Sequence, residues 1–585
     1  MKMKKAIFKG SAQEARSTNL SIKPLVVAVA LTLTFSPSIW AQQSNSKTDA
    51  ASELLSGDTT KIGGYVRAMG SWNLENAGSG NVGNNLLTND KMPSTGQDET
   101  GAMSMARGTV FLDFEAKRNQ TTIKASVRSD QEVETSYLKR LNQKRAGNSV
   151  LGLNALPTGK STSSDLMDQY NDTQIRDLYV DFPISENVQA RIGKQQVVWG
   201  ESDFFRAMDI VNGFDYRWRS FLEVENEELR KTNWMANFRI NFPEQNGSLQ
   251  AIIKPGLDRG EDIGNSYDIT GGRWANNPYR GVDFYNVNNA NSFTADPSTK
   301  AYLGTNYRHH LGDKKDTTGG LRWTGLEGNL NYSLAVLNGF GNPVVVPAGN
   351  SIIGSTGSTA EATSGSLGDV VFPKITAYGF TLNGYSPTFD AVFSTEQVLT
   401  TGVAYNFGSM KNGSQNPVFN IPGLDGYMKK NTVTSMFRMD KSVDLTKVIG
   451  TSRPSFGSVQ VFNTHILNYN KSDDLVGLIG FTGALKQNTT WVTGILGMNY
   501  SNDRINPALA VGGDMTNGGG FIIPSVEFVL GDFWRLKAEA DIFFSSKSRP
   551  QAFDNQGGNV ADPGAPLMGY FHGNDQFVLR LTRNF

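Results

Sequence analysis

The residues with the most evident chemistry in this chain are charged side chains of both signs that recur at every second position. In the stretch 108–130, Asp113 and Glu115 alternate with apolar residues, and so do Lys124 and Arg128 a few positions later. A period of two places alternate side chains on opposite faces of a strand, so these charges share one face of a predicted hairpin. Such a face can form cross-strand ion pairs, or it can select solutes by charge.

The same alternation recurs in later segments, near 177–195, 233–254 and 534–544. Their polar faces carry further charged or amide side chains, namely Asp177, Asp181, Arg191, Gln195, Arg239, Lys254, Glu539 and Asp541. We predict that all of these residues face a common water-filled interior while the apolar register faces lipid. Two interpretations stay open: ion pairs that brace a wall, and a ladder of charges that filters solutes.

The most distinctive local sequence joins the end of one such strand to an aromatic segment. Arg-Ile-Gly-Lys-Gln at 191–195 is followed by Trp-Gly-Glu at 199–201 and then by aromatic and basic residues. The aromatic candidates for the loop or for the lining of a pore are Trp199, Phe204, Phe205 and Trp218. We expect residues 201–231 either to line or plug a pore, or to pack against the mouth of their own barrel.

Strands must position these residues, and the chain has enough strand-like segments for about sixteen to eighteen of them. Short polar turns, such as 117–121 and 183–187, alternate with long segments, such as 131–172 and 256–319. Outer-membrane barrels have short periplasmic turns and long external loops. Hydrocarbon offers no partner for backbone N–H and C=O groups, so a sheet crosses a bilayer only when it is closed. We therefore predict an all-β, antiparallel transmembrane barrel over residues 61–585, with long extracellular loops.

Both ends of the chain carry export and assembly features. Residues 1–41 have the basic, apolar and small-residue regions of a secretory signal peptide, and the apolar run is too short for the alternative, an uncleaved membrane anchor. Residues 42–60 are predicted to be a periplasmic lead-in. Phe585 ends a strand-like alternation that resembles the signal read by the barrel assembly machinery. That machinery, outer-membrane lipid and lipopolysaccharide are expected partners.

Composition narrows the chemistry further. The chain has 585 residues, no cysteine and a formal net charge of zero. The lack of cysteine excludes disulfides and thiolate chemistry and suits an oxidising compartment. Because no basic excess is present, nucleic acid is not an expected partner. The acidic residues Asp258, Glu261, Asp262 and Asp268 do not match the spacing of a calcium loop, so we predict no metal and no cofactor.

The segment Arg-x-Gly-x-Gln-x-x-x-Trp-Gly-Glu at 191–201 resembles a motif of the large Gram-negative family called domain of unknown function thirteen-oh-two. The signal peptide, the strand pattern and the terminal Phe are compatible with that family over the whole mature chain. The resemblance implies an outer-membrane barrel, often encoded near lipid-binding lipoproteins and large efflux-type transporters. A periplasmic lipoprotein and an inner-membrane transporter are therefore expected partners, and the family has no established catalytic residues.

Three functions from different classes follow from the sequence. The first is an outer-membrane channel or transporter for small solutes, including amphipathic or aromatic molecules. The second is a non-conducting structural or receptor component that works with lipoprotein and efflux-type partners. The third is an outer-membrane hydrolase, which would need His465 or His572 beside a nucleophile, but no Gly-x-Ser-x-Gly motif is present. We therefore predict that the protein is not an enzyme.

Overall fold

The computed structural model describes the residues from which the wall of the fold is built. They are residues 58–75, 97–140, 167–202, 205–214, 219, 222, 226–256, 266–268, 275–277, 305–306, 316–341, 344–346, 368–371, 373–408, 426–476, 485–545 and 575–585. The predicted signal peptide and most of the predicted lead-in lie outside this set. The first strand begins at Thr59, within the predicted lead-in.

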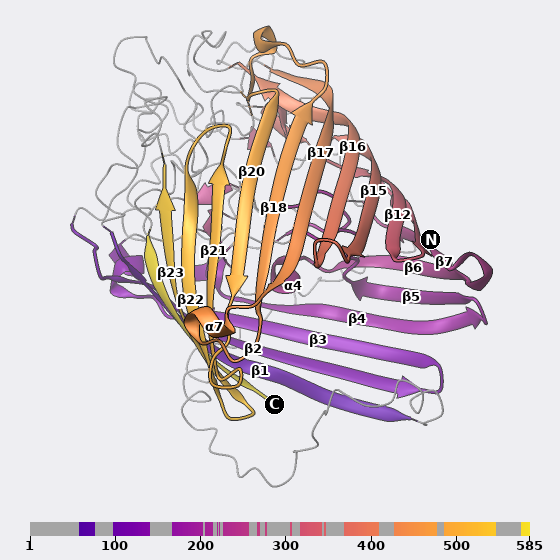
Figure 1. Ribbon diagram of the computed structural model, residues 1–585. Coiled ribbons are helices and arrows are strands. Elements are labelled where there is room, and N and C mark those ends of the chain that lie inside the picture. The colour runs from indigo at the N-terminus through magenta and orange to yellow at the C-terminus, as the bar shows by residue number, and fades with distance from the viewer. Residues whose placement is uncertain are drawn as a thin grey trace, which may run out of the picture. The chain divides into compact units, whose positions relative to one another are not determined.

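Long strands follow one another along the chain and pair in sequence order (Figure 1). The first seven are β1 (Thr59–Asn73), β2 (Met103–Arg118), β3 (Thr121–Glu132), β4 (Asp172–Ser185), β5 (Val188–Gln195), β6 (Asn233–Phe242) and β7 (Gly247–Lys254). The others are β11 (Thr318–Glu327), β12 (Leu330–Phe340), β15 (Lys374–Ser386), β16 (Ala391–Phe407), β17 (Gly426–Val443), β18 (Ser455–Ile466), β20 (Asn488–Gly497), β21 (Ile505–Asp514), β22 (Gly520–Leu530), β23 (Trp534–Phe544) and β24 (Gln576–Asn584).

Pairing between the last strand and the first closes the sheet. Residues 65–73 of β1 run antiparallel to residues 576–584 of β24, and all other neighbours in the wall are antiparallel as well. Phe585 continues this seam: its N–H donates to the carbonyl of Gly64 at 3.0 Å, and its own carbonyl accepts from the Gly64 N–H at 3.1 Å. The predicted all-β barrel is thus confirmed, with 18 strands. The assembly role of Phe585 stays a prediction.

The remaining described elements are small. They include the helices α3 (Met167–Tyr170), α4 (Asn226–Leu229) and α7 (Thr446–Ile449), and the two-residue strand β19 (Leu475–Val476), which extends the edge of β16. Short strands also pair as β8 (Ser266–Asp268) with β9 (Ala275–Asn277), and as β10 (Thr305–Asn306) and β13 (Val344–Val346) with β14 (Gly368–Val371). None of the described helices is long and apolar enough to cross a membrane.

Short turns join the strands at one end of the wall, as the sequence predicts. Asn119 and Asn246 adopt left-handed conformations with φ of 53° and 46°, which lets the chain reverse within a few residues. The turn between β15 and β16 is similar, with Asp390 at φ 49°. Long connections, such as those after β3 and β7, leave from the opposite end.

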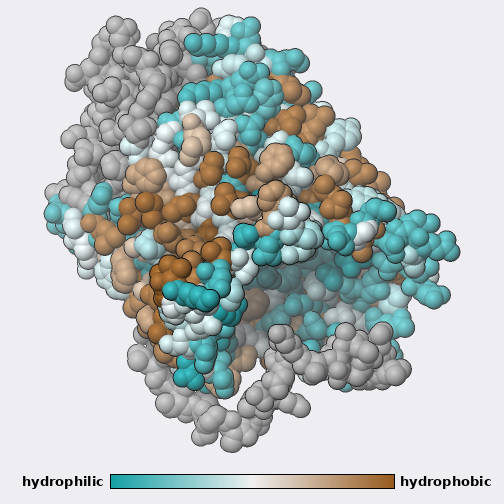
Figure 2. Space-filling model, viewed as in Figure 1, coloured by the Kyte–Doolittle hydropathy of each residue, from teal (hydrophilic) through white to brown (hydrophobic). Residues whose placement is uncertain are grey.

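The two faces of the wall differ in polarity. Apolar side chains such as Leu112, Val180 and Leu334 are exposed on one face, whereas Arg67 and Arg128 are buried on the other. Figure 2 shows apolar residues gathered in a belt across the strands on the viewed face, with hydrophilic residues at its ends. An apolar exterior and a polar interior are the arrangement that a bilayer requires of a closed sheet.

Candidate functional site

The connection between β5 and β6 folds into the barrel, and we call residues 196–232 the inward segment. Its described residues are 196–202, 205–214, 219, 222 and 226–232. They contact inner-face side chains of β1, β4, β7, β16, β17 and β23, which stand at different places around the wall. A segment that touches the inner face on so many sides crosses the interior.

A chain of neutral amides fixes the start of the inward segment. The Gln195 side chain donates to the carbonyl of Met235 at 3.1 Å and accepts from the Asn237 amide at 3.2 Å. The Gln250 amide in turn donates to the Asn237 carbonyl oxygen at 3.0 Å, and its own oxygen accepts the Trp199 indole N–H at 2.8 Å. Three neighbouring strands, β5 to β7, thereby hold one aromatic ring in place.

Trp199 is fully enclosed, with 0% of its surface exposed. Its ring lies over Gly320 of β11, where a Cβ atom would come within 2.7 Å of the indole. Met208 lies in the same way over Gly379 of β15. Trp199, one of the predicted aromatic loop or pore residues, anchors the segment, because its apolar ring and its N–H both find partners in the wall.

A buried carboxylate holds the next part of the segment. Glu396 of β16 is 1% exposed, and it accepts hydrogen bonds from the backbone N–H groups of Glu201 and of Met208, the latter at 2.7 Å. A Cβ at Gly200 would lie 2.7 Å from the Asp209 nitrogen and 3.2 Å from the Glu396 carboxylate. Glycine at this position therefore allows the carboxylate to reach two N–H donors, which is a structural reason for the Trp-Gly-Glu sequence.

Glu201 extends this attachment to two more strands. Its carboxylate accepts from the Asn383 amide of β15 at 2.6 Å, and its carbonyl accepts from Arg438 of β17 at 2.7 Å. Arg438 also pairs with Asp440 on its own strand at 2.7 Å. The first third of the inward segment is thus bonded to β7 and to three consecutive strands further around the wall, β15, β16 and β17.

Phe205 joins the segment to the next strands of the wall by aromatic contacts. Its ring centroid lies 5.5 Å from that of Phe462 of β18 and 4.8 Å from that of Trp491 of β20. Edge-to-face and tilted pairs at these distances are favourable. The other two aromatic candidates, Phe204 and Trp218, lie outside the described residues.

Ion pairs hold the returning part of the segment against the opposite strands. Glu228 of α4 accepts two hydrogen bonds from Arg67 of β1, both at 2.9 Å, and lies 3.6 Å from Arg128 of β3. Arg219 contacts Asp541 at 2.7 Å and Glu539 at 3.0 Å, both on β23. The bidentate pair between Arg67 and Glu228 fixes geometry as well as position, and Arg219 adds charge-assisted contacts to two carboxylates.

The predicted interior residues all lie on the inner register, and they differ in what they contact. Arg128, Lys254, Glu539 and Asp541 contact the inward segment directly, Lys254 through the carbonyl of Val211 at 3.2 Å. Other pairs brace the wall itself, with Lys124 to Asp113 at 3.2 Å and Arg191 to Asp181 at 2.6 Å. Asp177 bonds to Ser126 at 3.0 Å, and Glu115 and Arg239 occupy the same register.

Sequence reasoning missed several residues that hold the inward segment, namely Arg67, Asn237, Gln250, Arg322, Asn383, Glu396 and Arg438. Asn237 lies in a stretch whose alternation is regular, so its inward direction is readable from the sequence even though its partner is not. Glu396 lies between Thr395 and Gln397, so polar residues occupy both faces of the strand there and conceal the alternation. Its partners are about two hundred positions away, at Glu201 and Met208.

Little in the described structure corresponds to a metal or hydrolase site. Among the described residues, no group of three or more His, Cys, Asp or Glu side chains is placed to hold a metal ion. Asp258, Glu261 and Asp262 lie outside those residues, as does His572, and only the backbone of Asp268 is described. His465 faces outward from β18, where its ring bonds to Asn488 at 2.7 Å.

The closed wall, its apolar exterior and its filled polar interior define a β-barrel of the type that spans outer membranes. The chain belongs to the family described as "Protein of unknown function (DUF1302)", whose model matches residues 22–585, so the predicted resemblance is confirmed. No curated protein matches the sequence.

Several solved structures are similar to the chain at low identity. OccAB1 of Acinetobacter baumannii is 8% identical with a TM-score of 0.41, over 90% of this chain and 96% of that one. OpdK of Pseudomonas aeruginosa, solved with vanillate, is 9% identical with a TM-score of 0.39, over 90% and 98%. The outer membrane channel DcaP of A. baumannii is 9% identical with a TM-score of 0.35, over 90% and 98%. The fold of the present chain is established by its own strand pairing.

Replacement of Trp199 by Phe should loosen the inward segment. The change keeps the ring but removes the donor to the Gln250 oxygen, and an unsatisfied buried acceptor costs about 1–3 kcal/mol. We expect a lower midpoint when the detergent-solubilised barrel is unfolded by heat and followed by gel mobility. Trp323→Phe is the control, because that indole bonds to Tyr332 on the outer side of the wall at 3.3 Å. Equal midpoints for the two variants would contradict the anchoring role.

Proposed function

We propose that this protein is an outer-membrane channel through which small solutes pass between the barrel wall and the inward segment. The observation that carries the proposal is the attachment of this segment to several sides of a polar interior. Glu396 holds one part of it and Arg67 holds another. A segment fixed in this way reduces the cross-section of the lumen at a defined level, as a selective channel needs.

The proposed location rests on the wall and on the N-terminal sequence. The exterior carries exposed apolar residues on almost every strand, which water would disfavour and lipid would solvate. The signal peptide predicted over residues 1–41 would direct the chain to export. Together they favour insertion in the outer membrane, with the short turns on the periplasmic side.

The proposed solutes are small molecules with both aromatic or apolar and charged parts. The described inward segment presents Phe205, which is partly exposed, and Arg206, whose guanidinium lies 4.0 Å from the centre of the Phe214 ring. The wall contributes partly exposed charges of both signs, such as those of Lys124 and Asp113. Such a mixed surface offers weak contacts to amphipathic solutes without a deep binding site.

Conductance in planar bilayers tests the channel directly. We expect purified, refolded protein to give discrete current steps, and liposomes that contain it to swell in solutions of small aromatic acids. The control is protein left heat-denatured in the same detergent, as monitored by gel mobility. Folded protein that leaves bilayers sealed and liposomes unswollen would overturn the proposal.

The many anchors of the inward segment also favour a second candidate, a non-conducting component that works with a periplasmic lipoprotein and an inner-membrane transporter. If the segment seals the lumen, the wild-type protein gives no current, whereas a variant lacking residues 199–231 does. Co-purification of the wild-type protein with such partners, without solute flux, would then favour this second candidate.

A further inference from the structure

One sector of the inner face carries positive charge only. On the four consecutive strands β6, β7, β11 and β12, the charged residues of the inner register are Arg239, Lys254 and Arg322, and that register contains no Asp or Glu. We call the inner face of these four strands the basic sector. On other strands, by contrast, inner-face arginines contact carboxylates, as Arg191 does with Asp181 at 2.6 Å.

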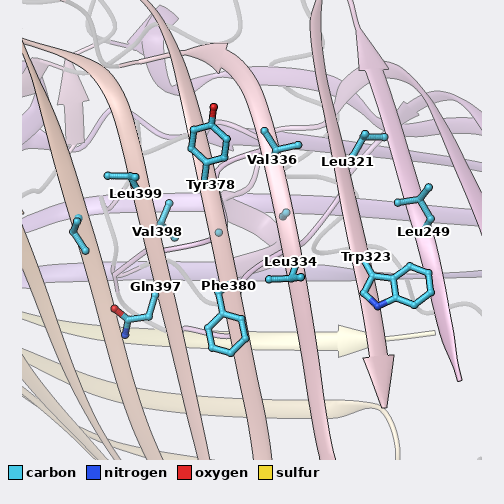
Figure 3. Close-up of a pocket in the computed structure, with 13 residues that line it drawn as sticks. Leu249, Leu321, Trp323, Leu334, Val336, Tyr378, Phe380, Gln397, Val398 and Leu399 are labelled. Atoms are coloured by element: carbon cyan, nitrogen blue, oxygen red, sulfur yellow. The ribbon is translucent and has the colours of Figure 1, made fainter. Parts of the chain in front are cut away.

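The direction of the two arginines follows from the neighbours along their strands. Arg239 is two positions from Asn237, whose amide bonds to Gln195 inside the wall, so both lie on the inner face. Arg322 lies between Leu321 and Trp323, which help to line an apolar groove on the outer face of the wall (Figure 3). Because successive side chains of a strand alternate, the Arg322 side chain points into the lumen.

The strand register places the two arginines in one row across the wall. Gln250 of β7 is paired with Arg239 of β6 on one side and with Arg322 of β11 on the other. Two strand spacings separate the two arginine backbones by about 10 Å. Long side chains from two positions this close can approach the same small solute.

The other polar groups of this row are engaged within the protein. The Gln250 side chain bonds to Trp199 and Asn237, and the Lys254 ammonium donates to the carbonyl of Val211 at 3.2 Å. They hold the inward segment and its supports in place. The row therefore leaves the two guanidinium groups for other contacts.

The two guanidinium groups have few partners among the described residues. Arg239 is exposed to the lumen, and no described residue forms a hydrogen bond or an ion pair with it. Arg322 donates one hydrogen bond, to the carbonyl of Val198 at 3.3 Å, and its Nε has no partner in the described part of the chain. Both cations thus retain donors that an incoming anion can use.

The carboxylates that act on Arg322 from other elements are held elsewhere. They belong to Glu201 and Glu396, and neither lies within the 4.0 Å of an ion pair with Arg322. Glu201 accepts from the Asn383 amide at 2.6 Å, and Glu396 accepts from the Met208 N–H at 2.7 Å. These attachments keep both carboxylates on the inward segment and its supporting strands, so they do not neutralise the row by direct contact.

We propose that Arg239 and Arg322 bind the carboxylate group of organic acids that pass between the wall and the inward segment. This inference rests on the proposed channel function and specifies the charged part of its solutes. A guanidinium presents two parallel N–H donors that match the two oxygens of a carboxylate. Arg322 contacts the inward segment at Val198, so the site lies where that segment narrows the lumen. Exposure of Arg239 to water keeps the binding weak enough for release, as passage requires.

Block of the ion current by a small aromatic acid tests the site. We expect benzoate to reduce the single-channel current at a lower concentration than benzamide, its uncharged analogue. In the double variant Arg239→Gln with Arg322→Gln, the half-blocking concentration of benzoate should rise at least tenfold, while that of benzamide should not change. Arg239→Lys should give an intermediate value, because it keeps the charge but loses the planar pair of donors.

Arg535→Gln is the matched control for the loss of a positive charge. Arg535 lies on the inner register of β23, where its guanidinium donates to the carbonyls of Gly531 and Trp534 at the turn, at 3.4 and 2.9 Å. We expect its half-blocking concentration for benzoate to equal that of the wild type, with unchanged heat-modifiable mobility for all variants. An equal rise for Arg535→Gln and for the double variant would overturn the proposal.

Thiol labelling separates the binding site from the channel function. The chain has no cysteine, so Asn241→Cys provides a single thiol, two positions from Arg239 on the same exposed face. We expect benzoate to slow its modification by a water-soluble thiol reagent several-fold more than benzamide does, and Arg239→Gln to remove that difference. This result in a barrel that leaves bilayers sealed would refute the channel and retain the site. Equal protection by benzoate and benzamide would overturn the site whether or not the barrel conducts.

Discussion

Arginine in place of Val180 should prevent stable insertion of the barrel, whereas arginine in place of Asn241 should be tolerated. Val180 of β4 is 38% exposed on the apolar face, and its register partners are Ile123 and Ile192. A charge on the lipid-facing side near the bilayer midplane costs about 2–4 kcal/mol, while a charge in the lumen stays in water. Asn241 is exposed on the inner register of β6.

The measurement is the fraction of each variant that shows heat-modifiable mobility in the outer-membrane fraction. We expect a large loss for Val180→Arg and a fraction close to wild type for Asn241→Arg. Ile240→Arg provides a second outward-facing test on the strand that carries the control. If the inward and outward substitutions are equally tolerated, the assignment of the two faces is wrong.

Replacement of Glu396 by Ala should increase the conductance of the channel several-fold. Without the carboxylate, the buried N–H groups of Glu201 and Met208 lose a charged acceptor, and hydrogen bonds to charged groups contribute about 1.5–3 kcal/mol each. Water that takes the place of the carboxylate can accept from these donors, but it does not tie residues 199–202 and 205–208 to β16, so this part of the segment is free to move away from the wall. That movement widens the lumen, and it should appear as larger single-channel current steps.

The matched control removes a different carboxylate from the inner face. Glu527 of β22 lies 3.9 Å from Arg580, so Glu527→Ala also deletes one negative charge from the lumen. If Glu527→Ala raises the current as much as Glu396→Ala, the effect is one of charge and not of attachment. Glu396→Gln should lie between wild type and Ala, because an amide keeps a carbonyl acceptor but brings its own N–H groups against the two donors.

Strand alternation was sufficient to predict the barrel and the direction of the charged side chains. Asp113 and Lys124 each alternate with apolar neighbours along their strands, so the sequence predicts both side chains on the polar face. In the structure, the Lys124 ammonium lies 3.2 Å from the Asp113 carboxylate. In the long stretch 375–406, the alternation did not show where one strand ends and the next begins. It contains two strands and a tight turn at Asp390, and the apolar and polar residues near that turn keep no regular period.

The attachment of the inward segment was beyond sequence reasoning for a physical reason. A side chain such as Trp199 is equally suited to contact a solute or to be enclosed by the wall, and the outcome depends on whether an acceptor meets its N–H. That acceptor, Gln250, and the space above Gly320 come from strands whose distance to Trp199 is set only by closure of the barrel.

The positions of the anchors along the chain also determine when the interior can be filled. The inward segment is synthesised long before its later partners: Glu201 bonds to Arg438, 237 positions further on, and Arg219 bonds to Asp541, 322 positions further on. Contacts between such distant residues form slowly, because the intervening chain must first be ordered. The segment therefore gains its last anchors only as β23 and β24 arrive. Closure of the wall and attachment of Arg219 to β23 are thus two results of one late folding step, and a chain halted before that step lacks this last anchor.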